Sequence, residues 1–591
     1  MGLEAIITII VVLLMLLALV FELYAPDVII FSALGFLILF GIVTPREALV
    51  GFSNEGMLTV AILFVVAYAA QSSGILEVLA NRVMGRSGGG RRSLLRLMLP
   101  VWSLSAFLNN TPIVSMFTPT IRDWAQRHNL APSKFLIPLS YASIFGGTCT
   151  LIGTSTNLVV HGMLQEQLGF GFSMFELAWV GIPCAFGGMI FILAFGDKLL
   201  PDRRDLSADF GEKGREYVLE MKLSKESTLI GKSVEEAGLR NLDHVFLVQI
   251  LRNGNVVAPV RPTDRLEEGD RLFFAGQVEG IVQVGRFSGL TPCHEWKFCS
   301  AVQKSGKGRV VEAVVSRSSP MLDKTLKEGN FRSRYDAAVL AVHRHGEKMN
   351  TSLGQLKLRP GDTLLLLTGE DFTKRWSTSR DFYMVSRSTV VPEINRRKTY
   401  ITLVTLLGMI LLAASGGMDI FAAAVLASVI LMITRTVTAV EARRSLEINV
   451  LVVIACAFGI SKALDKTGVA SEVAKLLITA AHGLGPVGLL AAIYLVTSLM
   501  TELITNNAAA ALVFPIAMAS AAQSGLNPMP FAVAIAIAAS ASFATPIGYQ
   551  TNLMVYGPGG YRFTDFFKIG IPMNLMFMVV AITVIPLVWK F

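Results

Sequence analysis

Polar residues interrupt the long apolar segments of this chain at places that match each other. AFLNNTPIVSMFTP at 106–119 resembles ELITNNAAAALVFP at 502–515 when the chain is compared with itself at an offset of 396, which aligns Asn110 with Asn506. A single Asn-Asn-Thr in an apolar helix often serves only for hydrogen bonding between helices. Two matched copies indicate instead a duplicated structural feature.

A second matched pair occurs at almost the same offset. GTSTNLVV at 153–160 resembles GYQTNLMV at 548–555, with Asn157 aligned to Asn552. In hydrocarbon an unpaired peptide group costs several kcal/mol, so non-helical backbone persists at membrane depth only where protein, water or a bound ion satisfies it. The sequence therefore predicts two related membrane halves, each with two places where helical structure is interrupted.

Composition supports an integral membrane protein. Of 591 residues, 53% are hydrophobic and only 16% are charged, which is too apolar for a soluble protein of this size. Basic cytoplasmic loops account for the net charge of +9, so a nucleic-acid partner is not expected. The five cysteines form no CxxC and have no zinc-type His spacing, so neither a disulfide framework nor a zinc site is predicted.

Five apolar runs long enough to span the hydrocarbon fall in each half. They lie near 4–24, 27–44, 56–80, 134–163 and 171–200, and near 398–415, 419–437, 448–464, 528–556 and 567–590. The interrupted stretches 98–126 and 485–522 are interpreted as re-entrant hairpins. An odd number of spans per half inverts the second half, so the predicted fold class is an all-α polytopic membrane protein with inverted repeats, re-entrant hairpins and broken helices.

Between the halves lies a polar insert with frequent charges and short alternating strands. It repeats internally at an offset of about 92, which predicts two small α/β modules. The expected domains are 1–202 for the first membrane half, 203–302 and 303–395 for the modules, and 396–591 for the second membrane half.

The distribution of Lys and Arg in short loops sets the expected orientation. The loops with Arg82 to Arg96, with Arg443 and with Lys568 are basic and should be cytoplasmic, whereas 164–170 and 416–418 carry no basic residue. With five spans per half, both termini lie outside and residues 203–395 lie in the cytoplasm. The first apolar run lacks a basic n-region and a small-residue cleavage site, so we expect a retained helix in the plasma membrane.

Interrupted helices supply two kinds of ligand. Free N–H groups at a helix start, with the positive end of the helix dipole, suit an oxyanion, and free C=O groups at a helix end suit a hard cation. Asn adds an amide donor and a carbonyl acceptor, and Thr adds a hydroxyl. We therefore expect each half to build one cation site and half of one anion site.

These motifs resemble those of the divalent anion/sodium symporter family, over about 400 residues of the two membrane halves. That family has Ser-Asn-Thr motifs in its re-entrant hairpins and a Thr-Pro-Pro-Asn type stretch in its broken helices. The resemblance implies an elevator-type transporter, a homodimer, and sodium as the coupling ion. Here Asn109 replaces Ser, Asn507 replaces Thr, and Ser155-Thr156 and Gln550-Thr551 replace Pro-Pro. With NNTP, GTSTNL and a soluble insert, the chain resembles the sulfate-type branch of the family.

Carrying the family's roles onto this sequence gives the expected site residues. The substrate-binding residues implied by the resemblance are Asn109, Asn110, Thr111, Thr154, Ser155, Asn506, Asn507, Tyr549 and Gln550. The sodium ligands implied by the resemblance are Asn110, Gly153, Thr505, Asn506 and Gly548.

The insert resembles a tandem pair of the C-terminal modules of potassium-uptake regulators (RCK_C, or TrkA-C). GKSVEEAGLRN with GDRLFFAG recurs as DKTLKEGNFRS with GDTLLLLTG. No GxGxxG precedes either copy, so no Rossmann nucleotide domain is predicted. The modules are expected to dimerise or to bind a small regulatory ligand. Arg240 and Arg332 occupy the same repeat position and are either ligand contacts or solvated surface residues.

The predicted function is sodium-coupled symport of a small divalent oxyanion, with sulfate favoured over a succinate-like dicarboxylate. A further alternative is a ligand-gated ion channel, against which no TVGYG-type filter occurs. Acids that could relay protons are scarce, and Glu502 beside the second hairpin motif is either a relay or a cap. No enzyme activity and no organic cofactor are expected.

Overall fold

The computed structural model describes the chain in several ranges. These are residues 2–21, 23–74, 90–128, 130–203, 218–239, 245–253, 255–257, 260–276, 290–292, 309–316, 318–344, 347–349, 355–368, 372–376, 379, 381–385 and 396–591.

Two helical halves flank the insert, and among the described residues each helix except α20 has a counterpart in the other half. The first half contains α1 (Leu3–Val20), α2 (Pro26–Leu39), α3 (Pro45–Leu49), α4 (Glu55–Ser72), α6 (Gly90–Ser105), α7 (Asn110–Arg127), α8 (Leu136–Gly147), α9 (Ser155–Leu168) and α10 (Ala178–Leu199). The second half contains α16 (Arg396–Ala414), α17 (Ile420–Ile433), α18 (Ala439–Ser445), α19 (Ile448–Lys466), α20 (Val469–Ala481), α21 (Gly485–Leu503), α22 (Asn506–Ser524), α23 (Met529–Ser540), α24 (Gln550–Tyr556) and α25 (Phe563–Val588).

Short connecting helices repeat as closely as the long ones. Thr44 caps α3 in a capping box with Glu47, and Thr438 caps α18 in the same way with Glu441. The apolar-run analysis did not predict these helices, because they are too short and too polar to register as spans. It also missed α20, which has a mixed polar and apolar surface, and it placed the start of α6 too late because Arg91 and Arg92 lie in its first turn.

The long helices have the length and composition of membrane spans. Among the described residues seven helices of at least 18 residues are apolar enough to cross a bilayer, and α2, α17 and α23 are shorter apolar helices. Large apolar side chains point outward along several of them, including Leu39, Ile190, Leu411, Ile433 and Leu575. Such extensive exposure of apolar side chains fits a surface that faces lipid rather than water.

Helical structure stops at all four places where polar residues interrupt the apolar segments. The predicted span 134–163 is divided between α8 and α9 by the break 148–154, and 528–556 is divided between α23 and α24 by the break 541–549. The stretches 98–126 and 485–522 each contain two helices joined by a short turn. The starts of α7, α9, α22 and α24 lie within the quoted polar motifs.

The insert contains two five-stranded antiparallel sheets. The first has the order β3 (Asn255–Val257), β2 (Val245–Arg252), β4 (Arg271–Gly276), β1 (Val218–Leu223), β5 (Leu290–Pro292). The second has the order β10 (Phe382–Val385), β6 (Arg309–Val315), β9 (Thr363–Thr368), β7 (Ala337–Arg344), β8 (Glu347–Lys348). Strands at equivalent repeat positions therefore occupy equivalent places in the two sheets.

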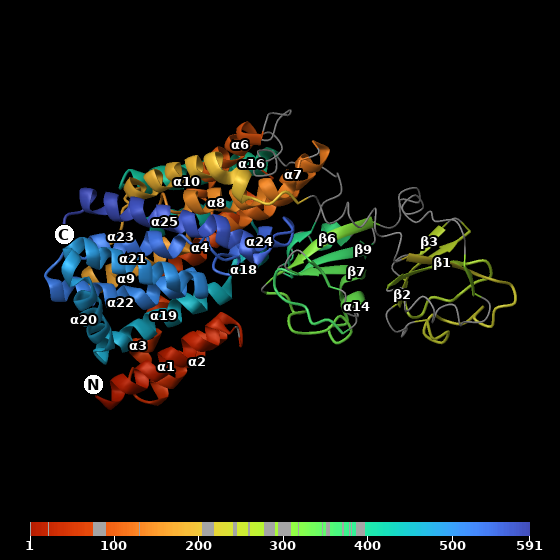
Figure 1. Ribbon diagram of the computed structural model, residues 1–591, viewed down its shortest axis with the longest axis horizontal. Helices are drawn as coiled ribbons and strands as arrows, with labels where there is room; N and C mark the ends of the chain where they lie inside the picture. The colour runs from red at the N-terminus through yellow and green to blue at the C-terminus, as the bar shows by residue number, and fades with distance from the viewer. Residues whose placement is uncertain are drawn as a thin grey trace.

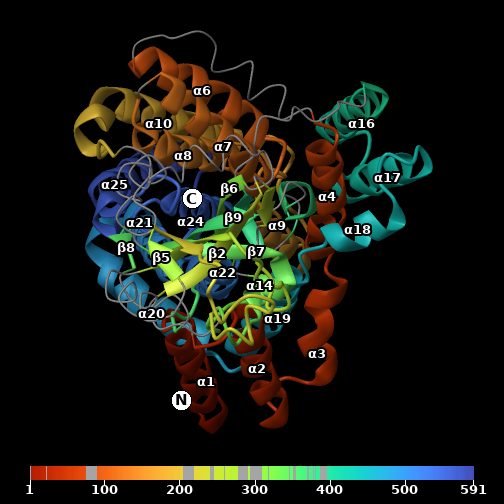
Figure 2. The same ribbon diagram turned by 90° about the vertical axis from the view of Figure 1, so that its right-hand side faces the viewer.

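The insert extends from one end of the helical part. The second sheet lies beside α7 and α24, and the first sheet lies farther out, while both chain ends lie at the opposite end of the helical part (Figure 1). Seen from the insert, α16, α17 and α18 lie on one side of the helical part, and α6, α8, α10 and α25 lie on the other (Figure 2).

Candidate functional site

The tip of the first hairpin is joined to the second broken helix through Asn110. This residue begins α7 and is 1% exposed. Its Oδ1 accepts a hydrogen bond from Ser105 Oγ at 2.5 Å, and its Nδ2 donates to the hydroxyl of Tyr549 at 2.5 Å. Asn110 and Tyr549 are 439 positions apart, so the contact connects the two membrane halves.

Further hydrogen bonds between the halves join residues at equivalent positions of the sequence repeat. Thr111 Oγ1 donates to Gln550 Oε1 at 3.2 Å, and Ser155 Oγ donates to Asn507 Oδ1 at 3.1 Å. Thr111 aligns with Asn507, and Ser155 aligns with Gln550, so the second bond is the repeat equivalent of the first. The two halves are therefore joined here in a pseudo-symmetric way.

One more contact joins a residue to its own repeat equivalent. Thr154 precedes α9 and Tyr549 precedes α24, and their hydroxyl oxygens are 3.3 Å apart. Because a residue can meet its own equivalent only near the axis that relates the repeats, this contact marks the centre of the pseudo-symmetric site.

The interior of each break is held by one asparagine in the same manner. Asn157 Nδ2 donates to the carbonyl oxygens of Gly147 and Thr150, at 3.0 and 2.8 Å. Asn552 Nδ2 donates to those of Ser542 and Thr545, at 2.9 and 3.1 Å. Since these carbonyls lack an intrahelical partner, each asparagine side chain satisfies the non-helical backbone that the membrane would otherwise penalise.

The second hairpin is less fully paired than the first. Thr501 Oγ1 lies 3.4 Å from Asn506 Oδ1, in the position that Ser105 takes towards Asn110. The buried hydroxyl of Thr505 has no hydrogen-bond partner. A buried hydroxyl without a partner costs free energy unless a ligand meets it, so Thr505 fits the role of an ion or anion contact.

Glu502 serves as a cap for the second break. Its carboxylate accepts hydrogen bonds from the backbone N–H groups of Ala544 and Thr545, at 2.9 and 2.8 Å. The Thr545 hydroxyl donates to it at 2.8 Å, and Asn574 Nδ2 donates at 2.7 Å. Of the two interpretations of Glu502, these four donors support the cap, because they satisfy and orient the charged form.

Gly147 and Gly548 lie close to the hairpins, and Gly153 lies close to Gly147. A Cβ at Gly147 would lie 3.0 Å from Asn110 Nδ2, and a Cβ at Gly548 would lie 2.8 Å from the Thr501 oxygen. A Cβ at Gly153 would lie 2.7 Å from the oxygen of Gly147. The backbone at these three positions is packed so closely that a side chain would force neighbouring atoms to move.

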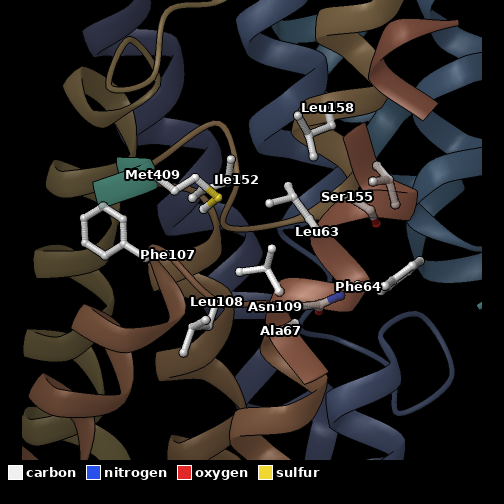
Figure 3. Close-up of a pocket in the computed structure, with 12 residues that line it drawn as sticks. Leu63, Phe64, Ala67, Phe107, Leu108, Asn109, Ile152, Ser155, Leu158 and Met409 are labelled. Atoms are coloured by element: carbon white, nitrogen blue, oxygen red, sulfur yellow. The ribbon is translucent and has the colours of Figure 1, made fainter. Parts of the chain in front are cut away.

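A small cavity of about 30 Å³ lies beside the first hairpin tip and the first break. Figure 3 shows Asn109 next to Phe64 and Ala67 of α4, with Ser155 nearby. Most of its lining is apolar, and Met409 of α16 completes it. The cavity thus lies between the first hairpin tip and the helices α4 and α16.

The geometry provides ligands of two chemical kinds at one place. The first residues of α7, α9, α22 and α24 come together, which concentrates helix N-termini suited to an anion. Oxygen atoms that suit a hard cation lie beside them, since a Cβ at Gly147 would lie 3.1 Å from Asn110 Oδ1 and 3.4 Å from the Gly153 carbonyl oxygen. Within the described ranges no group of three His, Cys, Asp or Glu side chains could hold a metal ion.

The structure brings most of the sequence-predicted site residues into this cluster. Asn110, Thr111, Thr154, Ser155, Asn507, Tyr549 and Gln550 contact one another across the halves. Asn109 faces the cavity, and Thr505 and Asn506 lie at the tip of the second hairpin. Sequence analysis missed Ser105 and Thr501, although both precede an aligned asparagine by five positions.

Of the two insert arginines that share a repeat position, Arg240 and Arg332, only Arg332 lies in the described part of the chain. Arg332 donates from Nη1 to the Val260 carbonyl oxygen at 3.1 Å and from Nη2 to that of Leu247 at 3.3 Å. It therefore joins the second module to the first, a role that neither of the two expected interpretations included. Arg240 lies outside the described residues.

Comparisons with known proteins identify the family of the chain. The family model described as a citrate transporter, CitMHS, matches residues 3–538. A Chlamydomonas reinhardtii protein named as a sulfur deprivation response regulator is 36% identical over 570 residues, covering 94% of this chain and 97% of its own length. Sodium/sulfate cotransporter 1 of the same alga is 27% identical, covering 94% of this chain and 86% of its own length.

The matched proteins support the prediction of a multi-pass membrane transporter and not an enzyme. Among solved structures, the YdaH transporter of Alcanivorax borkumensis is 13% identical with a TM-score of 0.42, covering 93% of this chain and 87% of that chain. The family model spans both helical halves up to α23 and the insert between them. The chain therefore belongs to the citrate transporter family, CitMHS.

Proposed function

We propose that this protein is a sodium-coupled symporter of a small divalent oxyanion, with sulfate as the favoured substrate. The observation that carries the proposal is the meeting of four helix starts from two repeated halves, joined by the bonds Thr111 to Gln550 and Ser155 to Asn507. Neutral donors converging from several helix starts are what a compact tetrahedral anion requires. The names of the algal sodium/sulfate cotransporters support the same substrate and coupling ion.

The proposed roles divide the cluster by ligand chemistry. Hydroxyl and amide groups bind the anion, and they are those of Asn109, Asn110, Thr111, Thr154, Ser155, Asn506, Asn507, Tyr549 and Gln550. Oxygen atoms bind sodium, and they come from Asn110, Gly153, Thr505, Asn506 and Gly548. Sodium bound first would hold the hairpin tips in place and offset the charge of the anion.

We further propose an elevator-type movement. The moving part, here called the binding unit, consists of α6–α10 and α21–α25. The remaining helices of the two halves form the frame, which contacts the binding unit through α4 against α9 and α19 against α22. The protein would act as a homodimer in the plasma membrane, with both termini outside and residues 203–395, which resemble tandem RCK_C modules, as a cytoplasmic regulatory domain.

A carboxylate substrate is the second candidate. The family description, citrate transporter, supports it directly. Several neutral donors bind a carboxylate as well as a sulfate, so substrate size and donor spacing would decide between them.

The deciding experiment is uptake of labelled sulfate into proteoliposomes driven by a sodium gradient. Saturable uptake that requires the gradient, and that unlabelled thiosulfate inhibits more strongly than succinate or citrate, is the expected outcome. Stronger inhibition by succinate or citrate would transfer the assignment to a dicarboxylate or tricarboxylate. Gradient-independent uptake would contradict sodium coupling.

Two substitutions test the assigned sodium ligands. Asn110→Ala and Asn506→Ala should each lower sodium-driven uptake at least tenfold while the purified protein still elutes as a folded species. Ser103→Ala is the matched control, because this exposed hydroxyl in α6 bonds only to the carbonyl of Leu99 in its own helix. Unchanged uptake in both asparagine variants would refute the assignment.

A further inference from the structure

The second module of the insert is joined to the first hairpin by a buried ion pair. Arg122 lies in α7, and Glu312 lies in β6. Arg122 Nη2 donates to Glu312 Oε1 at 2.6 Å, and Nη1 donates to Oε2, so the pair is bidentate. Both side chains are only 6% exposed.

A buried ion pair of this kind connects its two elements strongly. Removing one partner leaves an unpaired buried charge, which is far more costly than losing an exposed ion pair. Packing accompanies the charge contact, since Tyr383 of β10 lies against the hydrophobic core of the helical part. The contact between α7 and the second sheet is therefore both electrostatic and apolar.

The same module also contacts the second broken helix. Gly361, in the turn before β9, has φ +84°, and a Cβ there would lie 2.8 Å from Leu553 Cδ1 of α24. A Cβ at Gly557, directly after α24, would lie 3.1 Å from the Gly361 oxygen. The turn and the end of α24 thus approach each other as closely as two glycines allow.

The chain segment that leads from the helical part to the insert is also fixed to the helical part. Arg203 Nη1 lies 2.9 Å from Asp565 Oδ2 of α25. Ser133 Oγ donates to the Pro201 oxygen at 2.7 Å, and its own oxygen accepts a bond from the Tyr561 hydroxyl at 2.5 Å. These bonds hold residues 201–203 against the loop before α8 and the start of α25.

Both contacted helices start in the candidate site. Arg122 lies about 18 Å along α7 from Asn110 at 1.5 Å per residue, with Pro119 between them, and α24 runs from Gln550 to Tyr556. Both helices are continuous between these contacts and their first residues. A shift of the second module against α7 and α24 would therefore shift two of the four helix starts that meet in the site.

We propose that the second module is a fixed part of the binding unit, and that Arg122 and Glu312 are positioning residues that couple the module to the start of α7. A ligand or partner that displaces this module would then change anion affinity through α7, without touching the site. This coupling rests on the proposed transport function, whereas the anchoring itself does not.

Charge reversal tests the anchoring without any transport assay. Hydrogen exchange is measured on the full-length protein in lipid nanodiscs for the wild type, Arg122→Glu, Glu312→Arg and the double reversal. Each single reversal should raise exchange at least tenfold in β6 and in the first turn of α7, and the double reversal should restore protection. Single variants that exchange like the wild type in both elements would overturn the proposal.

A transport readout separates coupling from stability. In proteoliposomes with a sodium gradient, each single reversal should raise the sulfate concentration for half-maximal uptake several-fold, and the double reversal should return it. Glu312→Gln is the milder variant if the reversals do not fold, and Glu268→Arg, in an exposed pair with Lys225, is the control that should change nothing. Restored exchange without restored half-saturation would refute the coupling. If the wild type takes up no sulfate, exchange still decides the anchoring.

Discussion

At the scale of single residues, the site depends on pairs of side chains that the repeat places in equivalent positions. Ser105 and Thr501 precede Asn110 and Asn506 by five positions, and both hydroxyls lie within hydrogen-bond distance of the asparagine Oδ1. The hydroxyls orient the amides, so the amide oxygens are presented in a fixed direction. Ser105 is completely buried, which leaves its hydroxyl no alternative partner in solvent.

Ser105→Ala should therefore weaken sodium binding without unfolding the protein. Losing one hydrogen bond of about 1 kcal/mol should raise the sodium concentration for half-maximal uptake roughly fivefold. Ser103→Ala, two positions earlier in the same helix, should leave that concentration unchanged because its hydroxyl is exposed. An equal effect of both substitutions would show that the helix, and not the bond to Asn110, matters.

The carboxylate of Glu502 is another residue whose role the contacts define. Glu502→Gln would place an amide NH₂ group against at least one of the four donors that now point at the carboxylate. Leaving buried donors unpaired should lower the free energy of unfolding by about 1–3 kcal/mol. Thermal unfolding in detergent measures this loss of stability. Glu472→Gln, in an exposed pair with Lys475, is the control. Unchanged stability together with lost proton dependence of uptake would favour the relay.

At the scale of elements, the last helix of each half packs against a break through glycine. Gly181 of α10 contacts the backbone at Thr148, and Gly570 of α25 contacts the backbone at Phe543 and Ala544. These contacts hold the non-helical segments against the last helix of each half. A side chain at either glycine would force the break to move.

Gly570→Ala should therefore displace residues 541–549 and cost about 1–3 kcal/mol, as overpacking does in tight cores. Sodium-driven uptake should fall with it, because Gly548 and Tyr549 belong to the displaced segment. Gly408→Ala in α16 is the matched control, since a Cβ there meets nothing within 4 Å and alanine favours the helix. Normal uptake and normal melting of the Gly570 variant would show that the break tolerates the shift.

At the scale of the whole molecule, the insert and the two chain ends lie at opposite ends of the helical part (Figure 1). Basic loops suggest that the insert is cytoplasmic, and an inverted repeat of five spans would place both ends outside. Single cysteines test this arrangement, at Gln167 in a loop expected outside and at Glu226 in the insert, both exposed.

In a variant whose native cysteines are replaced by serine, a membrane-impermeant maleimide added to intact cells should label Gln167→Cys. It should label Glu226→Cys only after the cells are permeabilised. Labelling of Glu226→Cys but not of Gln167→Cys in intact cells would reverse the orientation. Labelling of both in intact cells would contradict an inverted repeat with an odd number of spans.

The sequence by itself determined the repeat and the places where helices stop. Gly, Thr and Asn in an apolar run conflict with a continuous buried helix, so the local pattern is sufficient to place the breaks near Gly153 and Gly548. The same reasoning found Asn110 and Asn506, because polar residues at membrane depth need partners or ligands. Short capped helices and α20 escaped it, since their formation depends on packing and not on apolar length.

Only the tertiary structure decided which residues meet. That Asn110 contacts Tyr549, 439 positions away, follows from how the two halves pack, which no local pattern encodes. Arg122 and Glu312 look like ordinary charged residues of a helix and a strand, yet they form a buried pair between membrane part and insert. Partner choice across such distances depends on the geometry of packed helices and sheets, whereas the tendency to break a helix is already present in a few consecutive residues.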